Sequence, residues 1–224
     1  MTSKEFRAFQ KENLERFNHI LASHPKGACD EQGLPSYTNP NPLMRWLVWK
    51  RVEVLFSIIN SLDLQKSSVL DFGCGYGLFL PLLAEKSKRI IAFDLDVKEL
   101  SKMGESSGWK NIIYLDDYYQ LASMGNYFDL ILASEVLEHV SDLENKIVDF
   151  SKLLTPKGIL LVSGPSENIL YKFGRKLAGY SGEYHERNIY QIKEMLTKYF
   201  KIEPAVIIIP IMPFYEILIC RRKY

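Results

Sequence analysis

The chain has 224 residues, 47% of them hydrophobic, and its 28 basic and 27 acidic residues leave a formal net charge of +1. This length and composition suit one α/β core with appended helices. Nucleic-acid-binding proteins usually carry an excess of basic residues, and this chain does not, so nucleic acid is not expected as a partner.

The cysteines indicate a reducing compartment. Cys29, Cys74 and Cys220 are widely separated, odd in number and lack the spacing of a metal site. We therefore expect a cytoplasmic protein without a bound metal. The charged N-terminal stretch does not resemble a secretory signal, and no apolar run approaches the roughly twenty residues of a membrane-spanning helix.

An N-terminal extension, residues 1–64, is predicted to be helical. Between Phe6 and Leu21 apolar residues recur at helical spacing, which predicts an amphipathic helix that packs over the mouth of the site as a lid. The stretch from His24 to Pro42 holds four prolines and reads as a linker or an ordered lid. The second helix, Leu43 to Leu62, carries Trp46 and Trp49 among basic residues. Such a segment either touches a membrane surface or docks on a sheet, and both readings stay open.

The core, residues 65–224, opens with a strand and a glycine-rich loop. Ser68 to Phe72 reads as a buried strand, and Leu78 to Ala84 reads as the helix that follows it. The candidate cofactor-binding residues are Asp71 near the end of the strand and Gly73, Cys74, Gly75 and Gly77 in the loop that follows. Glycine accepts positive φ and lets a ligand approach the backbone closely.

The loop spacing distinguishes between two kinds of nucleotide cofactor. Leu78 occupies the position of the last glycine in a dinucleotide fingerprint, which weakens a dehydrogenase interpretation. The carboxylate of Asp71 would repel a diphosphate, whereas it suits a ligand with sulfonium and ammonium charges. The loop therefore predicts S-adenosylmethionine as the cofactor. Cys74 is interpreted as packing filler in preference to a nucleophile.

Acidic residues follow the next two predicted strands. After Arg89 to Phe93, Asp94 is positioned to accept hydrogen bonds from ribose hydroxyls, and Leu95 joins the predicted cofactor site. Asp96 is assigned to capping the next helix, a role that Asp94 could also fill. After the predicted strand Asn111 to Leu115, Asp116 and Asp117 either accept a hydrogen bond from the adenine amino group or face water.

The fourth strand, Phe128 to Ala133, leads into Ser134 and Glu135, which complete the predicted cofactor site. A capping box at Ser141 to Glu144 is predicted to open a helix that runs to about Leu154. His139 then lies at the carboxyl end of the fourth strand, where open parallel sheets bind ligands.

His139 and His185 are the candidate general bases, because a histidine titrates near neutral pH. Each has an alternative role. His139 could instead hold a helix onto the sheet, and His185 could belong to a local ion-pair network. We also predict a lid helix over Glu167 to Leu177 and an acceptor-lining loop over Ser163 to Asn168.

The chain closes with a predicted helix, Ile189 to Tyr199, and two strands, Ile202 to Ile209 and Phe214 to Cys220. A short proline-containing turn joins these strands, so they read as an antiparallel hairpin.

Four segments together resemble class I SAM-dependent methyltransferases of the type 11/23-like group, which includes polyprenyl-quinone O-methyltransferases. They are Val69 to Gly77, Ala92 to Asp94, Phe128 to Val140 and Leu153 to Ser163. The resemblance implies an α/β fold with a Rossmann-like, seven-stranded, mostly parallel sheet, a C-terminal antiparallel hairpin and helices on both faces. It also implies S-adenosyl-L-methionine as cofactor and S-adenosyl-L-homocysteine as product. Arg45 or Arg51 would then be candidates to bind the methionine carboxylate.

The expected activity is in-line transfer of a methyl group to a small-molecule or lipid-linked acceptor, at oxygen. Two alternatives remain open: a nucleotide-binding oxidoreductase of the NAD type, and a catalytically idle SAM-binding protein. The sequence identifies neither the acceptor nor the oligomeric state, and peripheral membrane contact stays open.

Overall fold

The structure is a computed structural model that describes residues 3–25, 27, 29, 33–166, 187–203, 206–208 and 215–223. The chain divides into two compact units, Met1–Leu62 and Asp63–Tyr224. Among the described residues, no helix is long and apolar enough to cross a membrane.

The first unit consists of helices around an aromatic core. Its elements are α1 (Ser3–Ser23), α2 (Leu34–Tyr37) and α3 (Pro42–Ser61). Asn41 caps α3 by accepting hydrogen bonds from the first helical N–H groups, which explains why the helix begins there. Trp49 is buried, and its ring nitrogen donates to the carbonyl oxygen of Tyr37 at 3.0 Å. Trp46, by contrast, is 51% exposed.

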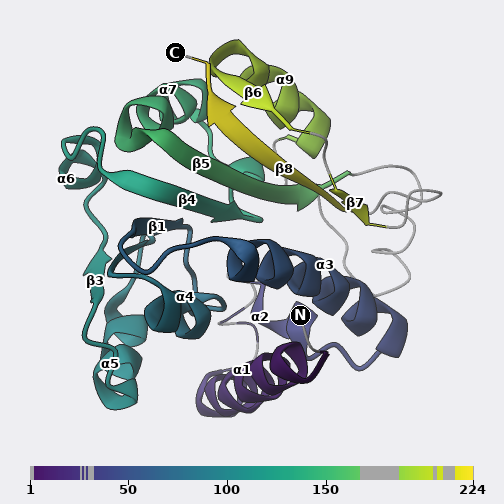
Figure 1. The fold of residues 1–224 in the computed structure, drawn as a ribbon. Coiled ribbons are helices and arrows are strands. Elements are labelled where there is room, and N and C mark those ends of the chain that lie inside the picture. The colour runs from purple at the N-terminus through teal and green to yellow at the C-terminus, as the bar shows by residue number, and fades with distance from the viewer. Residues whose placement is uncertain are drawn as a thin grey trace. The chain divides into compact units, whose positions relative to one another are not determined.

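The second unit is built on one sheet with the strand order β3-β2-β1-β4-β5-β8-β6, and β7 also pairs with β8 (Figure 1). The strands are β1 (Ser68–Phe72), β2 (Arg89–Phe93), β3 (Ile112–Leu115), β4 (Phe128–Ser134), β5 (Leu154–Pro165), β6 (Phe200–Ile202), β7 (Val206–Ile208) and β8 (Tyr215–Arg222). The first five strands are parallel, and β8 runs antiparallel to β5, β6 and β7.

Helices cover both faces of this sheet. They are α4 (Leu80–Lys86), α5 (Lys98–Ser107), α6 (Tyr118–Ala122), the short 3₁₀ helix η1 (Leu137–His139), α7 (Leu143–Leu153) and α9 (Ile189–Tyr199). Figure 1 shows α7 and α9 against one face and α4 against the other. On the first face, buried side chains of α7 and α9 form one core with the strands, among them Phe150, Ile192 and Leu218.

The predicted fold class is confirmed. Strands β1 and β2 have the predicted bounds, and the C-terminal pairing is antiparallel as expected. The seventh position of the sheet is shared by two short strands, since β6 and β7 pair with different parts of β8. This arrangement is the mostly parallel sheet with a reversed C-terminal strand that the resemblance implies.

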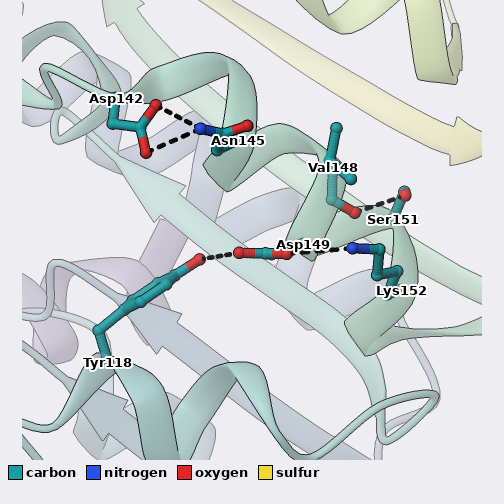
Figure 2. Close-up of polar contacts among 7 residues, drawn as sticks. All are labelled: Tyr118, Asp142, Asn145, Val148, Asp149, Ser151 and Lys152. Carbon is teal, nitrogen blue, oxygen red and sulfur yellow. Dashed lines mark hydrogen bonds and ion pairs between the residues drawn. The ribbon is translucent and has the colours of Figure 1, made fainter.

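Three local predictions were wrong. The helix after the glycine loop begins at Leu80 and not at Leu78, because turns closed by the N–H groups of Gly77 and Leu80 lengthen the loop. The predicted capping box of α7 does not form: Asp142 is the N-cap residue, and its side chain binds the amide of Asn145 (Figure 2). The predicted loop from Ser163 is strand through Pro165, since that segment pairs with β8.

Candidate cofactor and acceptor site

The glycine loop connects β1 to α4, and its N–H groups point into the protein. Those of Gly73 and Cys74 both donate to the carbonyl oxygen of Phe93, at 2.8 and 3.0 Å. The N–H of Gly75 donates to Oδ2 of Asp94 at 2.7 Å. The N–H of Gly77 donates to the carbonyl oxygen of Cys74 at 2.7 Å.

This arrangement differs from a phosphate-binding loop, which aims its N–H groups outward at the anion. The glycine requirement here comes from backbone geometry. Gly73 has φ of 73°, and a Cβ built on it would lie 2.3 Å from a methyl carbon of Val136. The loop is thus pressed against the segment that follows β4. The N–H groups of Gly73, Cys74, Gly75 and Gly77 are engaged within the protein, so they are not the outward donors that a pyrophosphate needs.

Asp71 is a buried carboxyl group on the central strand β1, with 4% of its surface exposed. Burial, and to a lesser extent the nearby charge of Asp94, together raise its pKa from 3.8 to about 7. The same two features, with the carboxylate of Asp71, hold the pKa of the Cys74 thiol well above its usual value. A cationic ligand placed here would relieve the repulsion between the carboxylates, whereas a diphosphate would add to it.

Asp94 follows β2 and is tied to the loop. Its Oδ2 accepts the N–H of Gly75, and its Oδ1 accepts the N–H of Leu95 at 2.7 Å. An ionised carboxylate offers about four acceptor positions, so both oxygens retain capacity for ribose hydroxyls. The side chain of Leu95 is 87% exposed beside it. Asp96 accepts the N–H of Lys98, the first residue of α5, at 3.0 Å, although the N-cap residue itself is Val97.

Asp117 is the N-cap of α6, and its Oδ1 accepts the N–H of Tyr119 at 2.8 Å. Asp116 precedes it and is exposed. Helix α6 is anchored to α7, because the hydroxyl of Tyr118 donates to Oδ2 of Asp149 at 2.7 Å (Figure 2). Burial, and then this hydrogen bond, raise the pKa of Tyr118. The anchor fixes the segment in which adenine contacts are predicted.

Three polar side chains form a chain of hydrogen bonds at the carboxyl ends of β4 and β5. The hydroxyl oxygens of Ser134 and Ser163 lie 3.0 Å apart, and the Ser163 hydroxyl donates to Oε1 of Glu135 at 3.0 Å. Glu135 has φ of 54°, a conformation that costs a non-glycine residue of order 1 to 3 kcal/mol. Its N–H also donates to the carbonyl oxygen of Ser163. Glu135 is therefore held firmly at the rim of the sheet.

His139 ends η1 and is exposed, just beyond this hydrogen-bonded chain. The next turn is fixed by Arg187, whose guanidinium donates to the carbonyl oxygens of Val140 and Ser141 at 2.7 and 3.1 Å. The structure thus places His139 at the carboxyl edge, as predicted from the sequence. His185 and the predicted lid helix at Glu167 to Leu177 lie outside the described residues.

The arginines considered for the methionine carboxylate make contacts inside the first unit. Arg45 donates to the carbonyl oxygen of Asn39 at 2.7 Å, and Arg51, which is 4% exposed, donates to the hydroxyl of Tyr37 at 3.2 Å. Their predicted role stays a prediction.

Sequence reasoning missed two contacts that shape the site. Ser163 was expected to begin a loop that lines the acceptor, whereas it lies in β5 and its hydroxyl joins Ser134 to Glu135. Tyr118 was not considered, although its bond to Asp149 anchors α6. No local pattern marks either contact, because the partners are 28 to 31 positions apart in the chain.

Comparisons with known proteins identify the family. Residues 48–201 match the model of a methyltransferase domain. The match covers more than half of the chain, so the chain belongs to this family, the class I SAM-dependent methyltransferases. S-adenosylmethionine is accordingly its cofactor, as the glycine loop predicted.

Curated relatives include the ubiquinone biosynthesis O-methyltransferases of Xylella fastidiosa (strain Temecula1) and Bartonella quintana. The first is 37% identical over 161 residues, which cover 69% of this chain and 59% of the relative. The second is 26% identical over 160 residues, which cover 68% of this chain and 63% of the relative. The chain thus spans less than two thirds of the length of these relatives.

Solved structures share the fold. A protein of Pyrococcus horikoshii superposes with a TM-score of 0.64 at 17% identity, covering 84% of this chain and 96% of that one. The N-methyltransferase NodS of Bradyrhizobium japonicum, solved with S-adenosyl-L-homocysteine, gives a TM-score of 0.61 at 20% identity, covering 85% and 92%. Neither alternative reading of the sequence gains support from these comparisons.

Proposed function

We propose that this protein transfers the methyl group of S-adenosylmethionine to a hydroxyl oxygen of a small or lipid-linked acceptor. The observation that carries the proposal is the pairing of buried Asp71 with Asp94 around a loop whose N–H groups are directed inward. Such a site favours a cationic nucleoside over a dinucleotide. The names of the curated relatives support oxygen as the methylated atom and a quinone-type acceptor.

Different residues along the edge of the sheet would bind different parts of the cofactor. Asp94 would bind the ribose hydroxyls, Leu95 would cover the adenine, and Asp116 or Asp117 would meet the adenine amino group. Gly73 to Gly77 would let the cofactor lie close to the backbone. Ser134 and Glu135, fixed by Ser163, would bind the methionine end.

Methyl transfer from a sulfonium depends mainly on holding the acceptor oxygen in line with the methyl group. Where the acceptor is a hydroxyl, its proton must also leave. His139 is exposed at the carboxyl edge and is the described residue proposed to take that proton. His185 remains a second candidate from the sequence.

A methyl-transfer assay with labelled S-adenosylmethionine tests the proposal. The acceptors would be a phenol, a polyprenyl quinol and a sugar, each beside an amine and a carboxylate of similar size. We expect a methyl ether from the phenol or the quinol. Methylation of the amine or the carboxylate alone would overturn the assignment to oxygen, and binding of NADH in place of S-adenosylhomocysteine would overturn the enzyme class.

A candidate base is tested by His139→Ala. We expect turnover to fall while the affinity for S-adenosylhomocysteine is retained. Unchanged turnover would remove His139 from the mechanism.

A further inference from the structure

Glu216 is a buried carboxylate that has no role in the cofactor site described above. It lies at the start of β8 and is 3% exposed. Its Oε1 accepts a hydrogen bond from Nζ of Lys193 on α9 at 2.7 Å. Its Oε2 is also buried but has no hydrogen-bond partner among the residues that the structure describes.

This arrangement is costly if it serves only the fold. Burying an acceptor without a partner costs about 1 to 3 kcal/mol, and more when the group is charged. A hydrophobic residue would fill the same position on the face of β8 that carries Leu218 of the core. Native proteins leave few buried polar atoms without a partner, and each calls for an explanation such as a functional role. Lys193 satisfies one oxygen, which leaves Oε2 to be explained.

The register of the sheet places Glu216 at the edge where ligands bind. Glu216 pairs with Gly164 of β5, one residue beyond the row in which Ser134, Ser163 and Ile217 lie side by side. In Figure 1, β8 lies directly beside β5. Neighbouring strands are about 4.8 Å apart, so the Cα of Glu216 lies about 10 Å from the end of β4.

The pleat directs the side chain of Glu216 to the face of the sheet that α9 covers, where Lys193 and Leu218 lie. Helix α9 begins beside the turn that follows His139, since Arg187 donates to the carbonyl oxygen of Val140. An acceptor held beside His139 would therefore approach Glu216 from the α9 face.

We propose that Glu216 binds the methyl acceptor by accepting a hydrogen bond from an acceptor hydroxyl through Oε2, while Lys193 holds the carboxylate in position. This inference rests on the proposed function and names a residue that selects its acceptor. A buried carboxylate that binds a hydroxyl rejects an analogue without one, because its oxygen is then left unpaired. Glu216 therefore makes the site selective for hydroxylated acceptors over their ethers.

The test uses two probes that differ in one hydroxyl, 4-methoxyphenol and 1,4-dimethoxybenzene. Each is titrated into the wild-type complex with S-adenosylhomocysteine and followed by ligand-detected NMR. We expect 4-methoxyphenol to bind at least tenfold more tightly than the diether. In Glu216→Gln this preference falls at least tenfold, since a hydrogen bond to a charged group is lost. Affinity for S-adenosylhomocysteine stays within about threefold of wild type.

Glu203→Gln is the matched control, because Glu203 also forms an ion pair, with Arg221 of β8, but its side chain is 36% exposed. It should keep the preference for the phenol. Glu216→Asp serves as a second variant if the glutamine variant does not fold. Aspartate keeps the carboxylate, but its side chain is one methylene shorter, so its oxygens lie farther from the acceptor. This variant should also lose the preference for 4-methoxyphenol.

Several results would overturn the proposal. These are no phenol binding by the wild-type complex, equal binding of the two probes, or an unchanged preference in the Glu216 variant that folds. A wild-type protein that does not bind S-adenosylhomocysteine would instead overturn the proposed function, and this inference with it. The two failures are distinguished because cofactor and acceptor binding are measured separately.

Discussion

Replacing Asp71 by asparagine removes a buried ionisable group and leaves its shape nearly unchanged. The folded carboxyl has a pKa of about 7, raised by burial and then by Asp94, against 3.8 without these effects. Folding therefore favours the protonated form. Between these two pH values the folded chain keeps a proton that the unfolded chain has lost, so the wild type becomes less stable as the pH rises.

The size of the effect follows from the pKa values. Each pH unit within this window changes the free energy of unfolding by about 1.4 kcal/mol per proton. Between pH 5 and pH 7 the wild type should therefore lose about 2 to 3 kcal/mol through Asp71, and little more above pH 7. The Asp71→Asn variant does not titrate at this position and should gain that amount relative to wild type.

Urea denaturation of both proteins at pH 5 and pH 8 measures the difference. Comparing the same pair at two pH values cancels any constant effect of the amide. We expect Asp71→Asn to gain about 2 to 3 kcal/mol relative to wild type at the higher pH. In an Asp94→Asn background the gain should shrink, because one cause of the raised pKa is gone. A difference that does not change with pH, or one that favours the wild type as pH rises, would refute the reasoning.

Two further substitutions test the structure around the cofactor. Gly73→Ala should destabilise the fold by about 2 to 5 kcal/mol, the sum of left-handed strain and overpacking. Gly108→Ala should cost only about 1 to 2 kcal/mol, because the φ of Gly108 is also positive, at 72°, but nothing lies near its Cβ. Equal losses of stability in thermal denaturation would show that the loop at Gly73 is not tightly packed. Tyr118→Phe should lower the stability by about 1 to 2 kcal/mol, because the hydrogen bond to Asp149 is lost. Tyr119→Phe should have no measurable effect, because the side chain of Tyr119 is 88% exposed. Similar effects in the two variants would contradict the anchoring role of Tyr118.

Much of the fold could be predicted from the sequence because its signals are local. The apolar runs of β1 and β2 are bounded by polar residues and glycine, and the structure keeps their predicted ends. The hairpin character of the C-terminus followed from two apolar runs and a proline-containing turn. From Ser163, in contrast, the sequence predicts a loop, and only pairing with β8 shows that the strand continues to Pro165.

Individual site residues were predictable where their position next to a strand or loop in the sequence is enough to identify them. Asp94 follows a strand at the expected distance from the loop, and the structure places it against Gly75. The inward direction of the loop N–H groups depends on the carbonyl oxygen of Phe93, which a sequence pattern does not reveal. Glu216 was missed for a similar reason. Its partner Lys193 comes from another element, and its burial depends on the packing of α9 against β8.

Calorimetric titration with S-adenosylhomocysteine tests the central claim most directly, using wild type, Asp94→Ala and Asp96→Ala. The wild type should bind, and Asp94→Ala should bind about 10 to 100 times more weakly, because charge-assisted hydrogen bonds to the ribose are lost. Asp96→Ala should stay within about threefold of wild type, since the Asp96 carboxylate accepts the N–H of Lys98 at the start of α5 and is not proposed to bind the cofactor. Undiminished binding by Asp94→Ala, or no binding by wild type, would contradict the assignment of this sheet edge to the methyl donor.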